Sequence, residues 1–419
     1  MLGVSYSQIL LFLELAIIIT TATTMATAVL TTATKAKATA TTTTGRRAAI
    51  AQLCSTKNKC TNLLNIAKCA GYAKAQNAVM LFLPECCGFM GDNAHHSLIS
   101  ADPAINVEVM SMRFRNDNNN DNSFRKAVAN QIDIYATTTT TTTSFSNTLT
   151  TQNNDDLNNN EDWPEGSFTS SIIEELRYIA YESQLWISGG GIHTRATTPS
   201  FPSSKDDANA GDDDDSGSND KIYNTHVVID NEGRLRAHYH KIHLFDVNIP
   251  NKVYLRESKT TLPGTQLVTC DSPLGKLGLS ICYDVRFSEM YVDLVSSKLG
   301  AQILLVPSAF TIPTGKAHWH TLLRARAIES QCYVIAAAQV GKHNDKRESY
   351  GHSVVYDPWG ELLVDAGGSD TTTTTTNDEK SPIHDVPSII FAYIDLENIE
   401  LVRERLPMQM HRDSSNYSY

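Results

Sequence analysis

The feature that most constrains the fold of this 419-residue chain is an alternation of short apolar runs with stretches of helical periodicity. Residues 48–53 predict a buried strand, residues 62–76 carry apolar side chains at helical spacing, and residues 79–83 form a second apolar run. This order is typical of a βαβ unit, in which a helical crossover brings two parallel strands together. The pattern alone predicts an α/β fold with two helical layers.

The same alternation returns further along the chain. We expect three more helices at residues 172–183, 288–299 (capped by Gly300) and 319–331. Further strands are expected at residues 185–192, 301–307, 333–339 and 389–394. In the first of these strands, glycines permit close approach of the backbone. A glycine-containing turn between residues 223–230 and 235–240 predicts an antiparallel hairpin.

Polar stretches interrupt this pattern, and we interpret them as inserts in surface loops. They are rich in Asn, Asp, Ser or Thr and lie near residues 101–168, 203–220 and 369–382. Residues 1–46 form an N-terminal extension whose hydroxyl-rich, acid-poor composition is typical of a targeting segment or of a disordered extension. We therefore expect one folded domain over residues 47–407 and a tail at residues 408–419.

Charge and cysteine content narrow the classes of function. The net charge of -11 argues against a nucleic-acid partner, because phosphate backbones require clustered Lys and Arg. Residues 9–20 are apolar but too short for a membrane span, so no stable membrane insertion is expected. The 8 cysteines include no CxxC pair and no dense spacing, which favours a reducing compartment over a disulfide scaffold. Together with the N-terminal extension, this leads us to expect an intracellular, mitochondrial or cytoplasmic, location.

Three ionisable side chains follow predicted strands. Cys282 ends a small apolar run, Glu85 follows another apolar run and a proline, and Lys241 follows an alternating strand. Open α/β sheets collect ligand chemistry at the carboxyl edge of their strands. A lone cysteine there is more often a core residue, a lone Glu a loop residue and a lone Lys a solvated one. The three together predict a nucleophilic site with a base and a fixed cation.

These segments resemble the nitrilase superfamily of carbon-nitrogen hydrolases, whose Glu-Lys-Cys set matches Glu85, Lys241 and Cys282 in order and context. The resemblance covers most of residues 47–407 and continues through the segments SAF (308–310), AHW (317–319), LRARAIE (323–329), QCYV (331–334), SYGH (349–352) and DPWG (357–360). It implies a four-layer α-β-β-α sandwich. These later segments are most similar to the deaminated glutathione amidases and less similar to the omega-amidases.

The resemblance also implies roles for individual residues. Cys282 would be the nucleophile, Glu85 the proton carrier, and Lys241 a cation that stabilises the oxyanion. The backbone N–H of Tyr283 would complete the oxyanion site. Glu257 would support the lysine, although an ordinary loop carboxylate is the alternative.

Substrate-binding candidates lie nearby in the sequence. Arg286 can hold a substrate carboxylate, although a buried ion pair is an equal alternative, and His318 and Trp319 can line the pocket. Arg324 and Arg326 fit packing or subunit contacts better. His320 stands where the subfamily pattern has Glu, which leaves the fine substrate preference open.

The histidines near Lys241 and the thiol of Cys282 also admit other interpretations. His238, His240 and His243 are candidate metal ligands. A hydrolytic zinc site requires a third ligand in tetrahedral position and an open coordination position, so we expect no metal and no other cofactor. A Cys-His dyad that uses Cys282 would leave Glu85 and Lys241 unexplained.

The resemblance implies an amidase that converts deaminated glutathione to 2-oxoglutarate and cysteinylglycine, a metabolite-repair reaction. The alternatives are an omega-amidase that acts on 2-oxoglutaramate and a non-catalytic scaffold with the same fold. The expected partners are a small-molecule amide and further copies of the same chain in a homo-oligomer.

Overall fold

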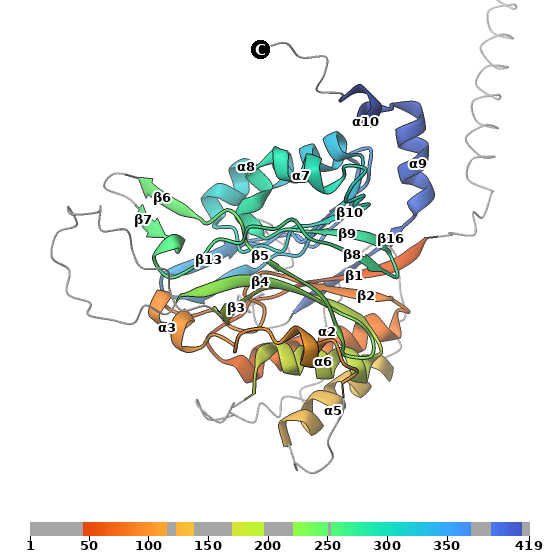
Figure 1. Ribbon diagram of the computed structural model, residues 1–419. Helices are drawn as coiled ribbons and strands as arrows, with labels where there is room; N and C mark the ends of the chain where they lie inside the picture. The colour runs from red at the N-terminus through yellow and green to blue at the C-terminus, as the bar shows by residue number, and fades with distance from the viewer. Residues whose placement is uncertain are drawn as a thin grey trace, which may run out of the picture. The chain divides into compact units, whose positions relative to one another are not determined.

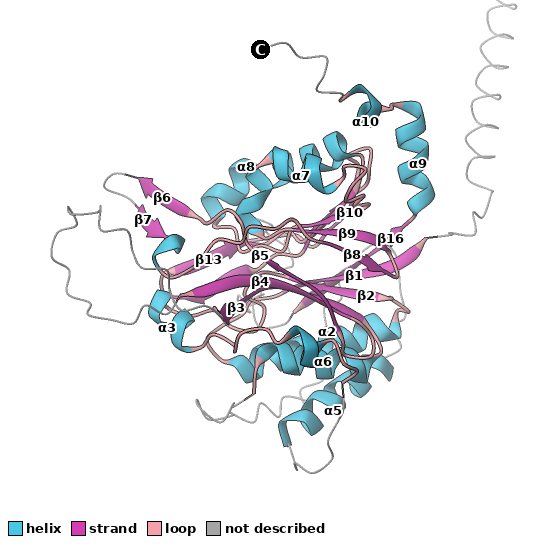
Figure 2. Cartoon of the chain, viewed as in Figure 1, coloured by secondary structure: helices cyan, strands magenta, loops and turns pink. Residues whose placement is uncertain are grey.

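The described residues form two six-stranded sheets packed face to face, with helices on both outer faces (Figure 1). The computed structural model describes residues 45–114, 123–137, 170–196, 221–249, 253–369 and 387–412. Figure 2 shows the helical layers outside the strands. This is the four-layer α-β-β-α sandwich that the sequence resemblance implies.

The first sheet contains the N-terminal strands of the domain and closes with the last strand of the chain. Its strands, in order across the sheet, are β16 (Ser388–Ile394), β1 (Arg46–Gln52), β2 (Met80–Leu83), β3 (Trp186–Arg195), β4 (Ile222–Ile229) and β5 (Leu235–His240). β1, β2 and β3 are parallel, and β3, β4 and β5 are successively antiparallel. The carboxyl ends of β2, β3 and β5 therefore lie at one edge.

The second sheet repeats this plan. Its strands, in order, are β15 (Leu362–Asp365), β14 (Val354–Tyr356), β11 (Tyr333–Ala336), β10 (Ile303–Leu305), β9 (Gly275–Leu279) and β8 (Thr269–Ser272). β9, β10 and β11 are parallel, and antiparallel strands flank them. Each half of the domain thus has a parallel centre.

The apolar runs of the first sheet have no polar face because both faces of these strands are covered. In β2, Met80 and Phe82 join the core between the sheets, whereas Leu81 and Leu83 join the core beneath the helices. Side chains alternate between faces with a period of two, so a strand buried on both sides is apolar throughout. This explains the continuous run in the sequence.

Helices cover each sheet on its outer side. The first sheet carries α2 (Lys59–Ala75), α5 (Ser123–Thr137) and α6 (Ile172–Ser183), and the second carries α7 (Ser288–Leu294) and α8 (Ile312–Ser330). Polar side chains cap two of these helices at their N-termini: Asn58 accepts from the N–H of Thr61, and Ser171 accepts from the N–H of Glu174.

Shorter elements complete the domain. They are α3 (Ala94–Ile99), α4 (Val107–Met110), β6 (Asp246–Ile249), β7 (Val253–Arg256), η2 (Glu257–Lys259), η3 (Cys282–Arg286), β12 (Val340–Asn344), β13 (Arg347–Tyr350), α9 (Leu396–Arg405) and α10 (Met408–His411).

The structure differs from the sequence prediction at several helix ends. α8 starts seven residues before the expected residue 319, with a proline in its first turn. It passes through Gly315, where the ring of Tyr350 leaves no room for a side chain: an added Cβ would lie 2.2 Å from it. α7 ends at Leu294, so Gly300 closes the following turn instead of capping the helix. α5 lies within the range interpreted as a polar insert, and its buried residue Ile132 packs in the same core as α2.

Other expectations concern residues that the structure does not describe. Residues 1–44, the insert near 203–220 and most of the insert near 369–382 lie outside the described residues. Within the described part of the chain, every helix is too short or too polar to cross a bilayer.

Candidate active site

Glu85, Lys241 and Cys282 converge at the shared carboxyl edge of the two sheets. Glu85 follows β2 by two residues, Lys241 follows β5 directly, and Cys282 begins η3 after β9. All three side chains are buried, with relative exposures of 5%, 3% and 9%. The structure thus brings together three residues that are far apart in the sequence.

Lys241 bridges two carboxylates. Its Nζ donates to Oε1 of Glu85 at 3.2 Å and to the two carboxylate oxygens of Glu257 at 3.2 and 3.0 Å. Glu257 also accepts from the backbone N–H of Phe245 at 2.7 Å. Because two anions fix the ammonium group, its charge is held at a defined point beside the thiol.

Further donors fix the carboxylate of Glu85. Nδ2 of Asn224 donates to Oε1 at 2.9 Å, and the backbone N–H of Ala309 donates to Oε2 at 3.1 Å. Nδ2 of Asn224 also reaches Glu257 at 3.4 Å, whereas its buried Oδ1 has no hydrogen-bond partner. Sequence reasoning missed Asn224. It lies in β4, and the backbone N–H of Lys241, directly after the neighbouring strand β5, donates to its carbonyl; only the strand pairing reveals this.

The charges of the site are set by burial and by mutual proximity. Burial alone would lower the pKa of Lys241, but the charges of Glu85 and Glu257 raise this pKa well above its ordinary value. Burial alone would raise the pKa of Glu85, but the charge of Lys241 and hydrogen bonds from Cys282 and Asn224 lower it. The resting site therefore contains a carboxylate and an ammonium ion.

Cys282 is a neutral thiol in the resting site. Burial and the neighbouring negative charge of Glu85 raise the pKa of Cys282 well above its ordinary value, despite the charge of Lys241 and a hydrogen bond from Ala309. The thiol is hydrogen-bonded to the carboxylate of Glu85. The positive charge of Lys241, which by itself would favour the thiolate, is thus outweighed in the resting state. Ionisation requires Glu85 to accept the proton.

The backbone at the nucleophile has an unusual conformation. Cys282 has φ of 50°, in the left-handed region, and its N–H donates to the carbonyl of Pro307 at 2.9 Å. Such conformations cost about 1–3 kcal/mol and cluster at functional sites. No hydrogen bond from the backbone N–H of Tyr283 is found among the described residues. That N–H is therefore available to a ligand oxygen.

Glycines in β3 make room for this arrangement, as the sequence predicted. A Cβ at Gly191 would lie 2.7 Å from Cγ of Glu85 and 2.8 Å from Oδ1 of Asn224. A Cβ at Gly190 would lie 2.2 Å from Pro307, which precedes the segment that contacts Glu85 from the second sheet. The two glycines allow the sheets to approach each other at the site.

The candidate substrate-binding residues lie on η3 and α8. Nη1 of Arg286 is 3.2 Å from Nδ1 of the exposed His318, and its guanidinium lies over the rings of Tyr283 and Phe310 at 5.6 and 5.4 Å. Arg286 has no carboxylate partner among the described residues, which disfavours the alternative of a buried ion pair. Trp319 is buried, and its ring packs against Phe310 at 4.8 Å. The buried Trp319 therefore supports the position of Phe310.

Arg324 and Arg326, for which the sequence favoured packing or subunit contacts, both bind backbone carbonyls within the domain. Nε of Arg324 donates to the carbonyl of Gly360 at 3.0 Å, and Nε of Arg326 donates to the carbonyl of Val285 in η3 at 2.9 Å. Arg326 therefore anchors α8 to the turn that carries Cys282.

The three histidines of the alternative metal interpretation do not share one site. The rings of His238 and His240 lie 5.3 Å apart, and His240 also stacks on Tyr223. His243 instead pairs with Asp284, with Nδ1 2.8 Å from the carboxylate. Within the described residues, no histidine is hydrogen-bonded to Cys282, so the Cys-His dyad also lacks support.

Comparison with known proteins gives a consistent family match. The model of the family described as "Carbon-nitrogen hydrolase" matches residues 47–404. The chain is 46% identical over 251 residues to a Dictyostelium discoideum protein named "Deaminated glutathione amidase", covering 59% of this chain and 72% of that one. A Bos taurus protein with the same name is 42% identical over 59% of this chain and 65% of its own length.

Solved structures share the fold. The crystal structure of the Caenorhabditis elegans NitFhit protein is 33% identical, covers 90% of this chain and 67% of that chain, and gives a TM-score of 0.59. Saccharomyces cerevisiae Nit3, a member of the nitrilase superfamily at 23% identity and a TM-score of 0.57, has the same fold.

Proposed function

Because the chain belongs to the carbon-nitrogen hydrolase family, we propose that it is an amidase that hydrolyses deaminated glutathione to 2-oxoglutarate and cysteinylglycine. The observation that carries the proposal is the buried contact of Lys241 with Glu85 and Glu257 beside the Cys282 thiol. The reaction needs no cofactor, because these side chains supply a nucleophile, a base and a cation.

Acylation begins with proton transfer. Glu85 accepts the Cys282 proton as sulfur attacks the amide carbonyl carbon, so the thiolate forms only when substrate is present. The tetrahedral intermediate collapses by breaking the C–N bond, and Glu85 returns the proton to the leaving amine of cysteinylglycine. The enzyme retains a thioester between Cys282 and the 2-oxoglutaryl group.

Deacylation reverses the roles. Glu85 accepts a proton from water, the resulting hydroxide attacks the thioester carbonyl, and 2-oxoglutarate leaves as the thiol regains its proton. A single carboxylate can serve both steps because it is ionised in the resting site, where Lys241 lies beside it, and because it returns to that state after each proton it accepts and gives back.

The developing oxyanion is stabilised by Lys241 and by the backbone N–H of Tyr283. Lys241 is preorganised by Glu257, so its charge requires no rearrangement during the reaction. Glu257 is thus a positioning residue.

The proposed substrate follows from the names of the relatives and from the charge near the site. Deaminated glutathione carries carboxylates at both ends, and Arg286 with the neighbouring His318 offers positive charge and hydrogen bonds to one of them. Omega-amidase activity on 2-oxoglutaramate is the second candidate. It would use the same chemistry and release ammonia.

A direct comparison of the two substrates tests the proposal. Purified protein should give a higher kcat/KM with deaminated glutathione than with 2-oxoglutaramate, and Cys282→Ala should abolish both activities. A preference for 2-oxoglutaramate would favour the omega-amidase. Absence of turnover with a panel of keto-acid amides would favour a non-catalytic scaffold.

We also propose a metabolite-repair role in a reducing compartment, with the chain assembled as a homo-oligomer. All 8 cysteines are free thiols, in keeping with such an environment. Light scattering of the purified protein measures the assembly state directly.

A further inference from the structure

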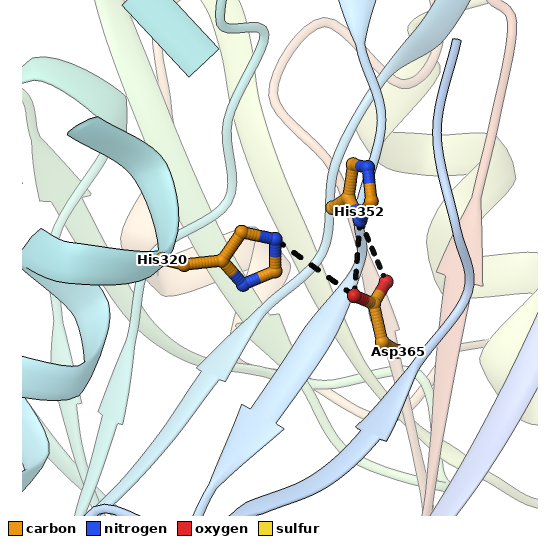
Figure 3. A group of neighbouring side chains, drawn as sticks. All are labelled: His320, His352 and Asp365. Atoms are coloured by element: carbon orange, nitrogen blue, oxygen red, sulfur yellow. Dashed lines mark hydrogen bonds and ion pairs between the residues drawn. The ribbon is translucent and has the colours of Figure 1, made fainter. Parts of the chain in front are cut away.

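A cluster of His320, His352 and Asp365 lies apart from the Glu85, Lys241 and Cys282 side chains. Within the described part of the chain, it is the one group of three or more His, Cys, Asp or Glu side chains whose ligand atoms lie close enough to hold a metal ion. Figure 3 shows His320 projecting from a helix toward the carboxylate, with His352 and Asp365 on neighbouring strands and loops. The proposed amidase chemistry uses none of the three.

The donor atoms converge on one point. Nδ1 of His352 lies 3.0 and 2.9 Å from the two oxygens of Asp365, and Nε2 of His320 lies 3.8 Å from Oδ2. All three ligand atoms lie within 4.8 Å of one another. In a tetrahedral zinc site, ligands at about 2.0–2.1 Å from the ion lie roughly 3.3 Å apart, so only small side-chain shifts are required.

The backbone around His352 is rigidly held. His352 has φ of 58°, its N–H donates to the carbonyl of Gly367 at 2.8 Å, and its carbonyl accepts from Nε1 of Trp319 at 2.7 Å. Gly368 leaves room for the imidazole, because a Cβ there would lie 2.3 Å from its Cδ2. A strained, over-determined conformation of this kind is typical of functional positions.

The other ligands also have supporting partners. Nδ1 of His320 lies 2.9 Å from the hydroxyl of Tyr356, which leaves Nε2 as the nitrogen that faces Asp365. Oδ1 of Asp365 accepts from the N–H of Gly367 at 2.8 Å. Metal-binding histidines usually have such a partner on the second ring nitrogen.

We propose that His320, His352 and Asp365 bind a divalent transition-metal ion, Zn²⁺ in the first instance, and that the ion ties α8 to the edge formed by β14 and β15. Two imidazoles and one carboxylate are ligands that suit Zn²⁺. The side chains of His320 and Asp365 are 35% and 24% exposed, which allows the ion to enter and water to take a fourth position.

The ion would brace one wall of the amidase site from outside. α8 carries His318 and Trp319, and its Arg326 donates to the carbonyl of Val285 in the turn after Cys282. The metal site would therefore have a structural role, and binding of the ion can be measured without turnover of any amide.

The test is a calorimetric titration of the chelator-treated, full-length protein with ZnCl₂. Wild-type protein should show one saturable site per chain. His320→Gln and Asp365→Asn should each weaken binding by at least about tenfold, since loss of even a supporting partner typically costs 10–100-fold in metal affinity. Co²⁺ should give the visible absorption of a tetrahedral site in wild-type protein only.

Two further variants refine the test. His352→Asn removes the imidazole but suits the left-handed backbone, because Asn tolerates positive φ. It should weaken binding as strongly as His320→Gln. Tyr356→Phe removes the hydroxyl partner of His320 and should weaken binding to a smaller extent.

Cys54→Ser and His238→Gln are the matched controls. Cys54 is the one cysteine that is not buried, and its sulfur lies 3.9 Å from Nδ1 of His343, which makes this pair the rival zinc ligand. Both controls should bind like wild-type protein.

Thermal unfolding distinguishes loss of metal binding from misfolding of a variant. Zn²⁺ should raise the Tm of wild-type protein and of both controls, but not of His320→Gln. His320 lies on a partly exposed face of α8, so this variant should fold and have a wild-type Tm without metal. Absence of saturable binding to folded wild-type protein, unchanged affinity in His320→Gln, or loss of binding in Cys54→Ser would each overturn the proposal.

Discussion

The paired charges of Glu85 and Lys241 determine the chemistry of single residues in this site. Lys241 lowers the pKa of Glu85, while burial and Glu85 raise the pKa of Cys282. A carboxylate next to a neutral thiol is the starting state for general-base activation.

Glu85→Gln should lower kcat by about 10²- to 10⁴-fold, because the amide cannot accept the thiol proton. Gln has the same shape and can retain the hydrogen bond from Ala309, so the fold should persist. Steady-state kinetics and circular dichroism measure the two effects. Glu289→Gln, an exposed carboxylate on α7, is the matched control and should leave kcat unchanged.

Lys241→Met should destabilise the fold by about 3–5 kcal/mol at neutral pH, because it leaves the buried carboxylate of Glu85 without its cation. The depressed pKa of Glu85 stabilises the native protein above the unfolded pKa of about 4.3, and this contribution is lost as pH falls through the lower folded value. The raised pKa of Lys241 contributes stability below about 10.4, which is lost as pH rises through the folded value.

The loss of stability in Lys241→Met should therefore grow as pH rises from about 4 toward neutrality. Urea unfolding of wild-type and variant protein across this range measures the difference. A difference that stays constant with pH would show that the charge of Lys241 does not stabilise Glu85.

At the scale of elements, β3 positions the site by bringing its glycines against β2 and the second sheet. Gly191 has φ of 34° and lies where any Cβ would meet Glu85 and Asn224. Gly300 also has positive φ, at 65°, but its nearest neighbour is Cδ of Lys276 at 4.0 Å. The two glycines share a backbone requirement and differ in their surroundings.

Gly191→Ala should reduce kcat/KM by about tenfold or more, because displacement of a catalytic group by about 1 Å can cost 10²-fold. Gly300→Ala should cost only about 1–2 kcal/mol of stability, the usual price of a left-handed backbone, with activity unchanged. Kinetics and thermal unfolding of both variants separate the effects. Equal activity in the two variants would contradict the positioning role of Gly191.

The sequence predicted helices and strands correctly where the deciding pattern lies within the element itself. Apolar runs revealed β1, β2, β9, β10 and β11, and a glycine turn revealed the β4–β5 hairpin. Prediction failed where a short local signal was overlooked. α8 has a proline in its first turn, and the buried residues Phe124, Val128 and Ile132 of α5 recur at helical spacing within a range that is otherwise polar.

At the scale of the whole molecule, one core joins the two sheets. Phe82 of β2 packs in the same apolar cluster as Leu279 of β9 and Leu305 of β10. The carboxyl edges that carry Glu85 and Cys282 are held together by this core. Stability and site geometry are therefore coupled.

Phe82→Ala should lower stability by about 3–5 kcal/mol, as expected for a cavity left by a buried aromatic ring. Loss of secondary structure and loss of activity on heating should shift together to lower temperature. Leu401→Ala, on the exposed face of α9, should change stability by less than about 0.5 kcal/mol. Activity that outlasts the unfolding of the core would contradict this coupling.

The sequence allowed the three central residues to be predicted, because each follows a recognisable strand. It did not reveal Asn224, the N–H of Ala309 or the His320 cluster, since these depend on strand pairing and on contacts between sheets. The protonation of Cys282 could not be predicted from the sequence either, because it depends on the burial of the thiol and on the positions of Glu85 and Lys241 beside it.

The central claim is that Glu85, Lys241 and Cys282 act together to form a covalent thioester. Rapid-quench mass spectrometry of the protein during turnover of deaminated glutathione tests it most directly. We predict a 2-oxoglutaryl adduct on the peptide that contains Cys282, reduced in Glu85→Gln and absent from Cys282→Ala. Full turnover by a folded Cys282→Ala protein without any adduct would contradict the account.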